Sequence, residues 1–180
     1  MKNVLILTGS PRRDGNSELL ADAFMEGAES AGNKVFKFEC ANKVIRPCIA
    51  CNTCYSAGSP CTLDDDFNLL APYIQNADAI VFACPLYWFT FPSSIKLVID
   101  KFYAFLMGNV DISKKDAYLL ACGEDININA FDGLILTYKQ IVNYLDWEDK
   151  GQIIVPNVRN IGDIKGSSVL IHTKELGAGV

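Results

Sequence analysis

The chain has little positive charge and no long apolar run. Its 16 lysines and arginines are outnumbered by 21 aspartates and glutamates, so the net charge is −5. A nucleic-acid binder needs a basic face that displaces counterions, and this composition argues against one. The first apolar run, Val4–Leu7, is too short for a signal sequence, and no later run reaches membrane-spanning length. We therefore expect a cytoplasmic protein that binds neither nucleic acid nor membrane.

Several motifs of nucleotide and phosphoryl chemistry are also missing. There is no Gly-Lys-Ser/Thr loop and no G-x-G-x-x-G fingerprint. No cysteine is followed by the arginine-closed loop of a cysteine phosphatase, which disfavours a phosphatase or other non-redox phosphoryl-binding protein. The one histidine, His172, falls in the last predicted helix and is interpreted as a surface residue. We therefore expect no catalytic acid or base from a side chain.

Apolar and amphipathic segments alternate along the 180 residues, half of which are hydrophobic. The pattern predicts an α/β fold, a doubly wound five-stranded parallel sheet of order 2-1-3-4-5 with helices on both faces. Residues 1–180 are expected to form a single domain, with a cysteine-rich insertion at about 40–66. The expected strands are Val4–Leu7, Lys34–Phe38, Ala79–Cys84, Ala117–Ala121 and Gln152–Val155. The expected helices are Ser17–Ala31, Phe67–Gln75, Ser93–Leu106, Phe131–Tyr144 and Ser167–Leu176.

The loop from Gly9 to Ser17 is a candidate phosphate site. It joins the first strand to the first helix, where backbone N–H groups are unpaired and the helix dipole favours an anion. Ser10, Asn16 and Ser17 would supply side-chain donors. Arg12 or Arg13 would supply a positive charge. The alternative is an ordinary loop in which Asn16 or Ser17 only caps the helix.

An aromatic loop follows the third strand. Its residues from Pro85 to Pro92 include Leu86, Tyr87, Trp88 and Phe89. They would stack against a flat heteroaromatic ring, with Cys122 and Gly123 closing the other side of the slot. The alternative is a cap on the core or a subunit interface. In the predicted strand order this loop lies beside the phosphate loop, and the two together describe a site for flavin mononucleotide (FMN).

Four cysteines lie in the long segment before the second helix: Cys48, Cys51, Cys54 and Cys61. Their spacing resembles the ferredoxin-type run that surrounds an iron–sulfur cluster. Zinc, a two-cysteine redox pair and a loop that binds nothing are the alternatives. The remaining cysteines, at 40, 84 and 122, lie on or beside predicted strands and are expected in the core or at strand ends.

The three motifs together resemble the flavodoxin-like NAD(P)H-dependent FMN reductases, and the cysteine loop resembles their iron–sulfur flavoprotein branch. The resemblance implies that FMN binds at two sets of residues and that the four-cysteine loop can hold one 4Fe-4S cluster. The phosphate ligands would be Ser10, Arg12, Asn16 and Ser17. The ring ligands would be Pro85, Leu86, Tyr87 and Trp88.

The expected function is that of an FMN-dependent oxidoreductase. Electrons would come from NAD(P)H or a ferredoxin-type donor and pass to a small-molecule or protein acceptor. The alternative is a non-enzymatic electron-transfer protein that carries the flavin and the cluster. The resemblance further implies a homodimer or homotetramer.

Overall fold

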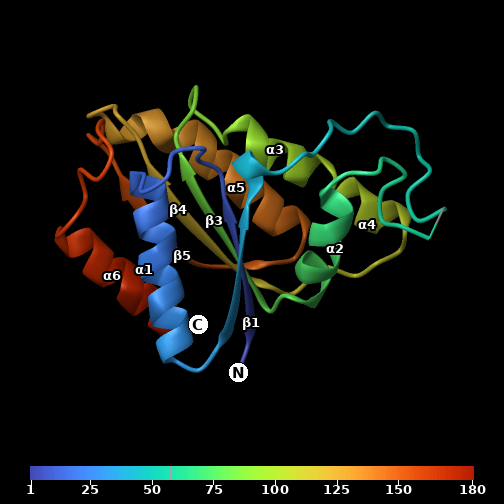
Figure 1. Cartoon of the computed structure of the whole chain (residues 1–180), viewed down its shortest axis with the longest axis horizontal. Coiled ribbons are helices and arrows are strands. Elements are labelled where there is room, and N and C mark those ends of the chain that lie inside the picture. Colours follow the sequence, from blue (N-terminus) through green and yellow to red (C-terminus); the bar gives the residue numbers. More distant parts are fainter. Residues whose placement is uncertain (57) are drawn as a thin grey trace.

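The computed structural model describes residues 1–56 and 58–180, which form a parallel five-stranded sheet with helices on both faces (Figure 1). The strand order is β2-β1-β3-β4-β5, which confirms the predicted topology. The strands are β1 (Asn3–Thr8), β2 (Lys34–Glu39), β3 (Ala79–Pro85), β4 (Asp116–Cys122) and β5 (Glu148–Val155).

The helices cover both faces of the sheet. They are α1 (Asn16–Ser30), α2 (Phe67–Asn76), α3 (Ser93–Asp100), α4 (Tyr103–Met107), α5 (Asp132–Tyr144) and α6 (Ser168–Ala178), with short 3-10 turns at Cys40–Asn42 and Ile128–Phe131. Helices α1 and α6 lie together on one face, and α2 to α5 lie on the other (Figure 1). Within the described residues, no helix combines the length and the apolar character needed to span a membrane.

Strand β3 explains why the sheet is covered on both sides. Every residue from Ala79 to Cys84 is buried. Successive side chains of a strand point to opposite faces, so Val81 packs in the core beneath α1 while Phe82 packs in the core beneath α5. A continuously apolar strand of this kind is typical of a parallel sheet between two helical layers.

The predicted helix Ser93–Leu106 is wrong in one respect, because the structure divides it into α3 and α4. At the break, Lys101 and Phe102 donate their N–H groups to residues three positions earlier, at 3.1 and 3.0 Å. Such bonds tighten the turn and end the α-helical ladder. Both side chains at the break are buried, so the change of direction places Lys101 and Phe102 in the protein interior. An apolar periodicity alone does not reveal a break of this kind.

Candidate functional site

A cleft of about 250 Å³ lies at the carboxyl edge of the sheet. The ends of β1, β3 and β4 converge there, as expected for the ligand site of an open parallel sheet. Its lining residues are Ser10, Arg12, Gly15, Asn16, Ser17, Pro85, Leu86, Tyr87, Cys122, Gly123, Glu124, Val158, Arg159 and Ile161. The cleft therefore brings the predicted phosphate loop and part of the predicted aromatic loop together.

The phosphate loop leaves the start of α1 open to an anion. Helix α1 begins after Gly15, and this N-cap residue makes no side-chain hydrogen bond to the first N–H groups of the helix. The hydroxyl of Ser10 accepts a hydrogen bond from the Arg12 N–H at 3.1 Å, which shapes the loop. Beneath the loop, the Thr8 hydroxyl is buried and has no hydrogen-bond partner in the described residues. Unpaired donors at a helix N-terminus suit a phosphate group.

Asn16 lies in the cleft wall, but its side chain already has partners. Its Nδ2 donates to the Asn160 carbonyl at 2.7 Å, and its Oδ1 accepts from the Ile164 N–H at 3.3 Å. The amide therefore ties the segment after β5 to the start of α1. In this arrangement an anion at the helix start would meet the backbone of Asn16 rather than its side-chain amide.

The other wall of the cleft is formed by the ends of β3 and β4. The Leu86 N–H donates to the Cys122 carbonyl at 2.7 Å, which joins the two strand ends. Gly123 lies so close to this wall that an added Cβ would be 3.1 Å from the Leu86 Cβ and 3.0 Å from the Phe131 ring. This packing borders the part of the cleft beside Tyr87, which is 41 % exposed and corresponds to the predicted slot.

Trp88 and Phe89 are not brought into this slot. Tyr87 and Thr90 exchange two backbone hydrogen bonds, and the residues between them have φ values of 45° and 66°. Positive φ at both central positions is the signature of a type I′ turn, whose side chains project away from the strand ends. Trp88 is accordingly 92 % exposed and Phe89 58 % exposed.

Cys122 combines a core position with a place in the cleft lining. It is 5 % exposed, and its sulfur lies against the Ser17 N–H at the start of α1. Burial raises the pKa of its thiol to about 12, so the group is neutral near pH 7. Cys40 and Cys84 are also buried, as the sequence predicts for cysteines on or beside strands.

The segment after β5 supplies cleft residues that the motif analysis missed. Val158, Arg159 and Ile161 line the cleft, and Arg159 Nε pairs with Glu124 Oε1 at 3.3 Å. The Asp163 carboxylate accepts the N–H groups of Arg159 and Asn160, which orders the turn. The predicted strand order could have indicated these residues, because the loop after β5 leaves the carboxyl edge of the sheet, where the cleft lies.

The four cysteines of the loop differ in their surroundings. Cys48 and Cys51 are exposed, Cys54 is half-buried and Cys61 is buried. Burial and, after it, the charges of the other three cysteines raise the pKa of Cys54. Within the described residues, no three metal-ligating side chains converge as a closed metal site. The donor set suits an iron–sulfur cluster, and the loop would have to contract to enclose it.

Comparisons with known proteins agree with this geometry. Residues 2–132 match the family described as NADPH-dependent FMN reductase. An iron–sulfur flavoprotein of Methanosarcina thermophila is 27 % identical over 159 residues, which cover 88 % of this chain and 79 % of that protein. An iron–sulfur flavoprotein of Archaeoglobus fulgidus is 36 % identical over 101 residues, covering 56 % of this chain but only 45 % of that relative's length.

A solved structure supports the fold. The NAD(P)H:quinone oxidoreductase from Methanothermobacter marburgensis has a TM-score of 0.71 at 21 % identity, covering 99 % of this chain and 95 % of that one. The family match spans most of the sheet and both loops of the cleft. The chain therefore belongs to the NADPH-dependent FMN reductase family of flavin oxidoreductases.

Proposed function

We propose that the chain binds FMN in the cleft and transfers electrons from NAD(P)H or a redox protein to a small-molecule or protein acceptor. The main support is that one cleft joins the N-terminus of α1, where Gly15 provides no side-chain cap, to the ends of β3 and β4. That junction suits a ligand with one phosphate and one flat ring. When bound, FMN supplies the hydride and single-electron chemistry, and the protein supplies placement and electrostatics.

The proposed phosphate ligands are Ser10, Arg12, Ser17 and the backbone of Asn16. Arg12 is exposed at the cleft and has a guanidinium free to turn toward an anion. A hydrogen bond to a charged group contributes about 1.5–3 kcal/mol, so Arg12→Ala should weaken FMN binding about 10- to 150-fold. Arg13→Ala is the matched control, because Arg13 is not among the residues that line the cleft. Equal affinities of the two variants in a fluorescence titration would contradict the assignment.

The proposed ring ligands are Pro85, Leu86, Tyr87, Cys122 and Gly123. These residues line the cleft and would exclude water from one side of the ring. Trp88 and Phe89, which are exposed on the adjoining turn, are proposed to contact the electron donor or acceptor rather than the ring itself.

We further propose that Cys48, Cys51, Cys54 and Cys61 hold a 4Fe-4S cluster. The name of the M. thermophila relative, an iron–sulfur flavoprotein, supports this assignment, as does the grouping of four thiols on one loop. Such a cluster would supply one-electron transfer to or from the cleft.

The proposed enzyme is distinguished from a pure electron carrier by its turnover. FMN-loaded protein should oxidise NADH or NADPH anaerobically in the presence of a soluble quinone, in a stopped-flow or absorbance assay. A carrier would instead accept electrons only from a reduced redox protein such as ferredoxin. Failure to oxidise NAD(P)H or reduced ferredoxin above background would overturn the proposed function.

A further inference from the structure

We propose that Lys101 is a positioning residue for the cysteine loop. Its buried ammonium group holds the sulfur of Cys61 and offsets the negative charge that a thiolate-bound cluster brings. The inference rests on the iron–sulfur cluster proposed above. It goes further by assigning a role to a side chain that is not itself a ligand.

Lys101 forms an ion pair in the protein interior. Its Nζ lies 2.5 Å from Asp65 Oδ2, and the two side chains are 1 % and 0 % exposed. Removing two charges from water is costly, and a buried pair is often no more stabilising than apolar residues of the same size. A buried lysine and aspartate at this position therefore call for a role besides stability.

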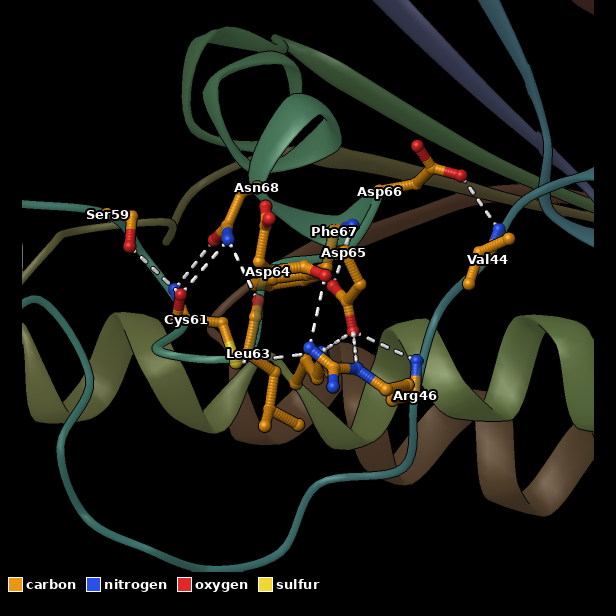
Figure 2. A network of polar contacts seen from close by, with 11 residues as sticks. Val44, Arg46, Ser59, Cys61, Leu63, Asp64, Asp65, Asp66, Phe67 and Asn68 are labelled. Atoms are coloured by element: carbon orange, nitrogen blue, oxygen red, sulfur yellow. Dashed lines mark hydrogen bonds and ion pairs between the residues drawn. The ribbon is translucent and has the colours of Figure 1, made fainter.

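The carboxylate of Asp65 is fixed from two sides. Its Oδ2 accepts the Arg46 N–H at 2.9 Å, and its Oδ1 accepts the Phe67 N–H at 3.1 Å (Figure 2). Arg46 precedes the cysteine loop and Phe67 begins α2, so Asp65 joins the two ends of the insertion. The position of the lysine ammonium is fixed in turn, because it is paired with this carboxylate.

Cys61 is held more firmly than the other cysteines of the loop. Asn68 accepts the Cys61 N–H at 2.7 Å and donates to the carbonyls of Cys61 and Leu63, both at 3.0 Å (Figure 2). Cys48 and Cys51 are exposed, whereas Cys61 is buried. Cys61 is therefore the preorganised member of the four, on which a cluster can be anchored.

Besides its ion pair with Asp65, the ammonium of Lys101 contacts the sulfur of Cys61. Lys101 Nζ lies 3.5 Å from Cys61 Sγ and 5.5 Å from the centre of the Phe67 ring. An ammonium group can only donate hydrogen bonds, and a thiolate accepts them better than a thiol does. The break between α3 and α4 occurs at this same residue and coincides with its burial.

The positive charge of Lys101 predicts how the reduction potential of the cluster should change when Lys101 is replaced. Hydrogen bonds to the sulfurs and nearby charges both affect the reduction potential of an iron–sulfur cluster. One-electron reduction adds negative charge, which a fixed cation stabilises. Loss of this cation should therefore make the midpoint potential more negative and the cluster easier to remove.

The test uses the full chain, purified anaerobically with FMN and its cluster. The main variant is K101Q, which removes the positive charge but keeps a hydrogen-bond donor beside Asp65, whose carboxylate still accepts the Arg46 and Phe67 N–H groups. D65N/K101Q, which removes both charges of the ion pair, takes its place if K101Q does not fold. K101R keeps the charge and serves as the conservative rescue. K96M is the matched control, since Lys96 is exposed on α3 and pairs with Asp100. FMN content and circular dichroism report whether each variant folds.

The readouts are the midpoint potential in an EPR-monitored dithionite titration and the rate of iron loss to a chelator. We expect a more negative midpoint and several-fold faster iron loss for K101Q, and faster iron loss for D65N/K101Q, with K96M unchanged and K101R near the wild type. A wild-type midpoint for a folded K101Q, wild-type iron loss for a folded D65N/K101Q, or a K101R midpoint as low as that of K101Q would overturn the role of Lys101. Wild-type protein with FMN but no iron would instead overturn the proposed cluster, and this inference with it.

Discussion

The close crossing of α1 and α6 predicts that one added methyl group lowers the stability of the protein. A Cβ added at Gly177 would lie 2.1 Å from the Phe24 carbonyl oxygen of α1. In the reverse direction, a Cβ at Gly27 would lie 2.0 Å from the Lys174 carbonyl oxygen. Both obstacles are helix backbone, which cannot move aside as a flexible side chain can. Gly177→Ala therefore has to separate the two helices.

The size of the effect follows from two opposing contributions. Real Cβ contacts stay beyond 3.0 Å, so the helices would have to separate by 3.0 − 2.1 = 0.9 Å at this point. Alanine favours a helix over glycine by about 1 kcal/mol. Forcing an extra methyl into a packed interface costs about 1–3 kcal/mol, and more where nothing yields. Because both obstacles are backbone atoms, the overpacking cost should lie at the upper end, about 2–3 kcal/mol, which leaves a net loss of about 1–2 kcal/mol in the free energy of unfolding.

Urea unfolding followed by circular dichroism measures this loss. The matched control is Gly179→Ala, whose nearest contact would be the Leu176 carbonyl oxygen at an ordinary 3.4 Å. We expect the control to change stability by less than about 0.5 kcal/mol. Helix α6 follows the segment that contains Arg159, which lines the cleft. Moving α6 should displace this segment, so G177A should also weaken FMN binding. A G177A protein as stable as G179A would refute the close-packing argument.

Three further predictions follow from the described contacts. Asn16→Ala removes both side-chain hydrogen bonds to the segment after β5 and should lower the free energy of unfolding by about 1–2 kcal/mol. An unchanged urea midpoint would show that these two hydrogen bonds do not contribute to stability. Hydrogen bonding by Thr53 lowers the pKa of Cys51, so in cluster-free protein near pH 7 iodoacetamide should label Cys51 before the buried cysteines. Thr53→Val should slow this labelling in mass spectra, and equal labelling rates in the two proteins would count against the role of Thr53. Burial raises the pKa of Cys40 and Cys122 from 9.0 to about 12, so the unfolded chain loses these protons first as the pH rises. The free energy of unfolding should therefore fall between pH 9 and 12, by up to about 1.4 kcal/mol per pH unit for each thiol. A urea midpoint that stays constant across this range would contradict the raised pKa values of these two thiols.

The sheet was predictable because its strands carry strong local signals. Ala79–Cys84 is continuously apolar, and the small residues after Val4–Leu7 mark the first strand-to-helix turn. The rule that parallel strands present their ligand at the carboxyl edge then brings the two predicted loops together. The structure confirms the strand order, and the cleft contains residues from both loops.

What the sequence did not reveal depends on contacts between distant segments. The break at Lys101 goes with its pairing to Asp65, which is 36 residues away. The use of the Asn16 amide depends on the segment around Asn160, and the exposure of Trp88 depends on a turn with two positive φ values. Periodicity and short motifs describe neighbours along the chain, so they cannot report such partners.

The most direct test of the account is the visible absorption spectrum of anaerobically purified protein, with iron and sulfide assays on the same sample. The account predicts flavin bands near 450 nm, as a flavin cofactor requires, together with broad iron–sulfur absorption and about four irons per chain. Flavin bands without iron would contradict the cluster and leave an FMN protein with a thiol loop. A colourless protein that also fails to bind added FMN would contradict the central claim.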